Sequence, residues 1–156
     1  VRLVVGKENS NHDLKGTPHP RTLPFPTDWE PPNMIHTSLE WMIERHGLDT
    51  NWGEQVVLDQ RNRLNMIHTL PGSSNTPHWH PDMDELWFVA KGECEWTVDD
   101  DEPFLAKKGD LVFVGAGRLH GIRTIGDESS IRYAMTSPDV IHYFLDNPDD
   151  PRPPKR

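Results

Sequence analysis

The sequence predicts an all-β protein, a sandwich or a closed barrel with an extended N-terminal arm and short flanking helices. From about residue 56 the apolar residues recur with a period of two, which is typical of half-buried strands. Turn-forming pairs such as Pro71-Gly72, Lys91-Gly92 and Lys108-Gly109 interrupt this pattern at short intervals. Many short strands joined by such turns favour a sandwich or a barrel.

The first part of the chain, residues 1–55, is expected to form an arm and a short helix that pack on the barrel. Residues 16–33 are rich in proline, which excludes a helix or a central strand and favours an extended arm. Residues 37–46 predict a helix, because Thr37 or Ser38 can cap its start and Gly47 can end it.

The barrel is expected within residues 56–136, since the length of the chain suits one domain. The expected strands are 56–58, 64–70, 86–89, 93–98, 111–114, 121–125 and 131–136. After them, Ser137-Pro138-Asp139 resembles a cap with proline at the first helical position and predicts a short helix over 137–146. Residues 147–156 are rich in proline and aspartate and are expected to be disordered.

Composition excludes several classes of partner. The net charge is -9 and no cluster of lysine and arginine forms a basic stripe, so nucleic acid is not expected to bind. No apolar run approaches the roughly 20 residues of a membrane span, so no membrane association is expected. The single cysteine, Cys94, excludes an intramolecular disulfide and favours a reducing, cytoplasmic compartment.

Four residues have the spacing of a metal site: His78, His80, Glu85 and His120. His78 and His80 are two apart, so both side chains leave the same face of a strand. Glu85 begins the next strand after a short turn, and we expect a hairpin to return it beside the two histidines. Leaving such polar groups inside a barrel without a metal would be costly. Imidazole and carboxylate donors suit one divalent transition metal; Fe and Mn are favoured, and Cu, Ni, Zn and Co fit the same donors.

These residues belong to two glycine-bounded motifs: Gly72-x5-His78-x-His80-x4-Glu85-x6-Gly92 and Gly109-x5-Gly115-x-Gly117-x2-His120. Together the motifs resemble both halves of the signature of the cupin superfamily, over about residues 56–136. The resemblance implies a small single-domain cupin with a double-stranded β-helix, a jelly-roll barrel, that holds its metal through the four residues above. The first motif is also similar to that of oxalate decarboxylases and germin-like cupins. Cupins commonly dimerise, so a homodimer is implied as well.

Other residues are candidates for a substrate pocket around the metal. Trp87 and Val89 share the face of Glu85, and Ile122 shares the face of His120, so these three are expected to form an apolar wall. Arg118 is a candidate catalytic residue at the mouth of the barrel, where its guanidinium would hold an anionic group. The alternative is a surface arginine on an exposed turn.

The alternation of the strands does not say which way a second group of polar residues points. His68 is a candidate acid or base that either faces the pocket or lies on the surface. Arg61 and Arg63 share one strand face, which points either inward or into solvent.

The expected function is that of a metal-dependent oxidoreductase of the dioxygenase or oxidase type, acting on a small organic substrate. The alternative is a metal-dependent decarboxylase, lyase or isomerase of a small acid or sugar, in which the metal acts as a Lewis acid. A binding protein without turnover is the third hypothesis. The fold itself does not choose among them.

Overall fold

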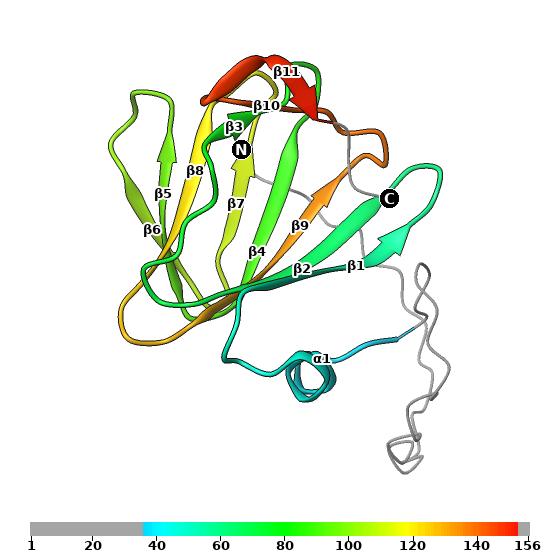
Figure 1. The fold of residues 1–156 in the computed structure, drawn as a ribbon, viewed down its shortest axis with the longest axis vertical. Coiled ribbons are helices and arrows are strands. Elements are labelled where there is room, and N and C mark those ends of the chain that lie inside the picture. Colours follow the sequence, from blue (N-terminus) through cyan, green and yellow to red (C-terminus); the bar gives the residue numbers. More distant parts are fainter. Residues whose placement is uncertain (1–35, 153–156) are drawn as a thin grey trace, which may run out of the picture.

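A computed structural model describes residues 36–152 of the chain, in which two antiparallel sheets face each other (Figure 1). The described elements are α1 (Leu39–His46), β1 (Trp52–Leu58), β2 (Arg63–Thr69), β3 (His78–Trp79), β4 (Glu85–Lys91), β5 (Glu93–Val98), β6 (Phe104–Lys107), β7 (Leu111–Val114), β8 (His120–Ile125), β9 (Ser130–Thr136), β10 (His142–Phe144) and β11 (Asn147–Arg152). One sheet has the order β1-β2-β9-β4-β7 and the other has the order β11-β10-β3-β8-β5-β6. The predicted all-β class is therefore confirmed.

The main core lies between the two sheets and follows the alternation of the sequence. On β4, Trp87 and Val89 are buried while Phe88 between them is exposed. On β5, Cys94 and Trp96 are buried in the same way. Because successive side chains of a strand point to opposite faces, one face of each sheet supplies this core. The same alternation places Glu85, at the start of β4, on the inner face.

The predicted helix is present and covers the outside of the first sheet (Figure 1). The Ser38 side chain accepts a hydrogen bond from the backbone N–H of Trp41, and Gly47 ends the helix with a φ of 75°. Met42 packs with Val56 in a second core cluster on this outer side. Within residues 36–152 no helix has the length and apolar character needed to cross a membrane. The predicted arm of residues 16–33 lies outside the described residues.

The helix predicted over residues 137–146 is wrong. Pro138 and Asp139 form a turn, and the chain continues into β10, which pairs with β3 through Tyr143 and Trp79. Strand β11 then pairs with β10, so residues 147–152 are ordered in a sheet where disorder was predicted. The capping pattern is local, and hydrogen bonding to a strand distant in the sequence outweighs it.

Candidate metal centre

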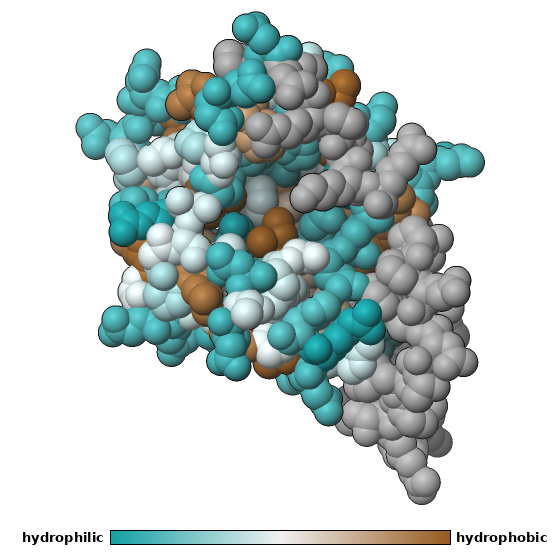
Figure 2. Space-filling view, in the orientation of Figure 1, coloured by the Kyte–Doolittle hydropathy of each residue, from teal (hydrophilic) through white to brown (hydrophobic). Residues whose placement is uncertain are grey.

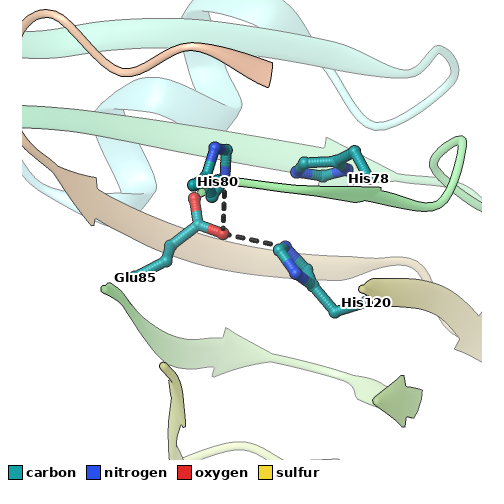
Figure 3. A group of neighbouring side chains, drawn as sticks. All are labelled: His78, His80, Glu85 and His120. Carbon is teal, nitrogen blue, oxygen red and sulfur yellow. Dashed lines mark ion pairs between the residues drawn. The ribbon is translucent and has the colours of Figure 1, made fainter. Parts of the chain in front are cut away.

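The four predicted ligands come together inside the barrel. Their donor atoms all lie within 4.8 Å of one another, and all four residues are buried. Figure 3 shows the side chains of His78, His80, Glu85 and His120 pointing toward a common centre. His78 and His120 are opposite each other in the pairing of β3 with β8.

The hairpin expected to carry His80 and Glu85 is not formed. Strand β3 pairs with β8 and β10 in one sheet, while β4 pairs with β7 and β9 in the other. The turn between them therefore crosses from one sheet to the other. As a result the histidines approach from one wall of the barrel and Glu85 approaches from the opposite wall (Figure 3).

Backbone carbonyl groups fix the orientation of the three imidazole rings. The contacts are His78 Nδ1 to Thr76 O at 3.0 Å, His80 Nδ1 to Ile141 O at 3.0 Å and His120 Nδ1 to Arg118 O at 3.1 Å. Since a carbonyl oxygen only accepts, the Nδ1 of His80 and of His120 carries the proton and the Nε2 of each neutral ring has a free lone pair. His78 Nδ1 also lies 3.3 Å from the amide nitrogen of Asn75. Metal-binding histidines characteristically have this outer hydrogen bond.

The donor atoms that face the centre have no other partner. Nε2 of His80, Nε2 of His120 and Oε2 of Glu85 are buried without a hydrogen bond of good geometry. His120 Nε2 lies 3.0 Å and His80 Nε2 lies 3.5 Å from Glu85 Oε2. Buried polar atoms are normally satisfied, so this convergence needs an explanation. A divalent transition metal held by three imidazoles and one carboxylate fits these atoms.

Electrostatics favour the metal-binding form of His78 and Glu85 but not that of His80. Burial lowers the pKa of His78 to about 4, so this ring is neutral at neutral pH. Burial would raise the pKa of Glu85, but the His120 and His80 rings beside it outweigh burial and hold the pKa well below its ordinary value. For His80, burial opposes protonation, yet contact with the Glu85 carboxylate raises its pKa above the ordinary value. Glu85 is therefore anionic, and protons compete with a metal for His80 more strongly than for an ordinary imidazole.

A cavity of about 220 Å³ adjoins the candidate metal centre. His78, Glu85 and Trp87 line it, together with Arg132 and His142. In the space-filling view the surface is hollowed near its centre, where hydrophilic and hydrophobic residues meet (Figure 2). Of the three residues predicted to form an apolar wall, Trp87 lines the cavity. Val89 and Ile122 are buried in the core between the sheets instead.

Arg118, the predicted anion-binding residue, lies on the surface instead. Its Nε donates to the Asp99 carboxylate at 2.7 Å, and its Nη2 pairs with Asp101. The Arg118 side chain is 42% exposed, and its charge is already matched by the two aspartates. The role as a substrate anchor is thus wrong, and the alternative of a surface arginine holds, because the acidic turn after β5 attracts the guanidinium.

His68 is neither in the cavity nor on the surface. It is fully buried on the outer face of β2, where its Nδ1 contacts the Thr50 carbonyl at 2.8 Å and its ring stacks on Trp52. Its predicted catalytic role is therefore wrong. The sequence left open whether Arg61 and Arg63 point inward or into solvent. Arg61 is exposed, and Arg63 is buried on the inward-facing side of β2.

Among the cavity residues that sequence reasoning missed are the two with further ionisable side chains, His142 and Arg132. The His142 ring lies 4.5 Å from the His80 ring and 5.0 Å from the His78 ring, centroid to centroid. Its strand was predicted as helix, so no signal placed it there. Arg132 alternates with Ile131 and Tyr133 in a predicted strand, and this alternation alone does not say which face is inward.

Comparison with known proteins agrees with this geometry. Residues 65–148 match the sequence profile of the Cupin domain family. Among curated proteins no match is found. A solved structure of a conserved protein with a double-stranded β-helix domain from Klebsiella pneumoniae has a TM-score of 0.59 and 23% identity, covering 67% of this chain and 84% of that one. An RmlC-like cupin family protein from Methanocaldococcus jannaschii has a TM-score of 0.56 and 23% identity, covering 68% of this chain and 94% of that one. At these identities the likeness establishes the fold alone, a double-stranded β-helix.

Proposed function

This chain belongs to the cupin family, and on that premise we propose that it is a mononuclear metal-dependent oxidoreductase, of the dioxygenase or oxidase type. The substrate is a small organic molecule that enters the cavity beside the metal centre. Fe or Mn is the favoured metal. The supporting observation is the convergence of His78, His80, Glu85 and His120. Buried donor atoms of the last three have no hydrogen bond of good geometry.

Each part of the site has a task in this proposal. The four ligands hold the ion, which supplies redox chemistry when it is bound. Backbone carbonyls keep the Nε2 atoms of the histidines pointed at it. Trp87, which is 4% exposed, excludes water from one wall of the cavity. A dry site protects reactive species from side reactions.

Elemental analysis and oxygen uptake test this proposal together. We expect close to one Fe or Mn per chain, and oxygen uptake that depends on a substrate from a panel of small acids, phenols and sugars. His120→Ala should lose both the metal and the oxygen uptake, whereas His36→Ala, a change at an exposed histidine, should lose neither. Full activity in His120→Ala would contradict a catalytic metal.

The second candidate function is a non-redox decarboxylase, lyase or isomerase. His142 favours it, because this ring lines the cavity beside His78 and His80. Burial lowers the pKa of His142 to about 3, so the neutral ring offers a nitrogen that can accept a proton from a bound substrate. Such chemistry needs a general acid or base near the metal. Turnover of a substrate without oxygen uptake, lost in His142→Phe while metal content is retained, would favour this candidate over the oxidoreductase.

We also propose a cytoplasmic location. Its support is the single cysteine, Cys94, which is a buried free thiol. Fractionation of cells that produce the full-length natural protein tests this placement, and recovery in a secreted or membrane fraction would contradict it.

A further inference from the structure

Arg132 is a buried cation without an acidic partner. It lies on β9 with its side chain on the inner face, is 2% exposed and lines the cavity. Among residues 36–152 no carboxylate lies within ion-pair distance of its guanidinium. Its Nε has no hydrogen-bond partner. Charged groups are almost never buried in this way unless something compensates the charge.

The Arg132 guanidinium is nevertheless held in one place. Its Nη1 donates to Thr69 Oγ1 at 2.8 Å and to Ser130 Oγ at 3.3 Å. Its central carbon lies 5.7 Å from the centre of the Trp87 ring, a cation–π contact. A fixed guanidinium with unused hydrogen-bonding capacity is suited to the two oxygens of a carboxylate.

The charges around the cavity leave a positive excess. Arg63 is a second buried cation on the inward-facing side of β2, and its Nε is also without a partner. The only carboxylate that lines the cavity among the described residues is that of Glu85, which the metal would occupy. Arg63 does not itself line the cavity, but the Arg132 guanidinium does, and together with a divalent ion it would outweigh the one carboxylate. An anion in the cavity would restore the balance.

The size and lining of the cavity narrow the class of anion. A cavity of about 220 Å³ suits a small molecule. Asn65, a residue of β2, lines the same space and offers an amide donor and acceptor for a further polar group. His78 and Glu85 also line the cavity, so one ligand can reach both the metal centre and Arg132.

We propose that Arg132 is the anchor of a carboxylate-binding subsite, and that the substrate of this protein is a small organic acid. The acid would direct one oxygen toward the metal centre and its carboxylate toward Arg132. The claim that the acid is turned over rests on the proposed function. The claim that the acid binds rests only on residues of the chain.

Isothermal titration in a buffer low in chloride tests the subsite. The probes are acetate, malonate and succinate, each compared with its uncharged amide, and inorganic phosphate. Both metal-loaded and metal-free protein are titrated, and the metal content of the same samples is measured. We expect at least one carboxylate to bind about tenfold or more tightly than its amide in both forms, as charge-assisted hydrogen bonds give.

Variants identify the anchor. Arg132→Met should abolish the preference for carboxylate over amide, and Arg123→Met, a matched change at an exposed arginine of β8, should leave it intact. Asn65→Asp keeps Arg132 and adds a negative charge to the cavity, so it should weaken carboxylate binding by about tenfold. If Arg132→Met does not fold, the effect of Asn65→Asp on carboxylate binding tests the subsite.

The outcomes separate the two proposals. Full metal uptake with no preference for any carboxylate would overturn the subsite and leave the metal centre standing. A carboxylate preference that depends on Arg132, in a protein that takes up no metal, would support the subsite and overturn the proposed oxidoreductase. Phosphate bound more tightly than every carboxylate would overturn the class of substrate.

Discussion

Protons and metal ions compete for the same imidazole nitrogens in the candidate centre. His80 has a pKa above its ordinary value of 6.5, because the neighbouring Glu85 carboxylate outweighs burial. As the pH falls through that raised pKa the ring gains a proton, which a metal must then displace. The depressed pKa of Glu85 keeps the carboxylate ionised throughout this range.

We therefore expect the affinity for metal to fall as the pH is lowered from about 8 to about 6, by up to about tenfold for each pH unit. Competition with a chromophoric chelator, calibrated at each pH, measures this change. An affinity that is the same at both ends of the range would contradict competition between protons and metal at His80.

Strand β10 supports the geometry of the candidate metal centre. It pairs with β3, and the residue before it, Ile141, supplies the carbonyl that contacts His80 Nδ1 at 3.0 Å. Tyr143 of β10 stacks on Trp79 of β3, with ring centroids 5.5 Å apart. This stacking contact helps to hold the carbonyl in place, although it lies outside the cluster of ligands.

Tyr143→Ala should therefore weaken metal binding by about 10-fold, the lower end of what loss of an outer-shell contact typically costs. Tyr133→Ala is the matched control, because Tyr133 packs in the second core cluster on the outer side of the other sheet. That control should lower the temperature of unfolding while metal affinity stays within about twofold. Equal metal affinity in the two variants would contradict a positioning role for β10.

The turn between β4 and β5 depends on a glycine. Gly92 has a φ of 72°, and a Cβ at this position would lie 2.6 Å from the Ser129 carbonyl oxygen. Gly126 has a similar φ of 74° but open space around it. The two positions separate the cost of the backbone conformation from the cost of a steric clash.

Gly126→Ala should lower the free energy of unfolding by about 1 kcal/mol, the cost of a left-handed conformation. Gly92→Ala should lower it by about 3 kcal/mol, since the clash with backbone atoms adds to that cost. Chemical denaturation of both variants measures the difference. Equal losses would mean that the backbone near Ser129 moves away without penalty.

Sequence patterns predicted the elements whose determinants are local. The period of two and the flanking turns located β5 and β7 at residues 93–98 and 111–114, and the cap at Ser38 located α1. The metal ligands were predicted because spacing fixes the face that a side chain takes. Which sheet holds each strand was not, since neighbours depend on pairing between distant segments. His142 was missed because its strand was predicted as a helix, and Arg132 was missed because alternation does not say which face of a strand is inward.

At the scale of the whole molecule, α1 packs on one part of the outer side of the first sheet, and among the described residues another part of that side is an apolar face with exposed side chains. Its exposed members on three neighbouring strands are Phe88, Leu111, Phe113 and Met135. Leu111 is 67% exposed and Phe113 is 65% exposed. Contiguous apolar surface of this kind commonly marks an interface, and β7 is also the edge of its sheet. We propose that this face forms a homodimer with a second copy of the chain.

Phe113→Lys should convert the dimer into a monomer, because a charge would be buried in the interface. Light scattering after size-exclusion chromatography measures the mass. Leu105→Lys is the control, since Leu105 is 57% exposed on β6, in the other sheet, and this variant should remain a dimer. A natural protein that is monomeric at every concentration tested would exclude the interface.

The late position of Ile141 in the chain bears on how the protein matures in the cell. All four ligands precede residue 121, but the carbonyl that orients His80 belongs to residue 141 and the strand that supports it follows. During translation the histidines therefore leave the ribosome before their orientation is secured. If the four residues hold a metal, we expect a stable centre only after β10 has been synthesised and paired, so a nascent chain stalled shortly after β9 would contain all four residues and bind the ion weakly.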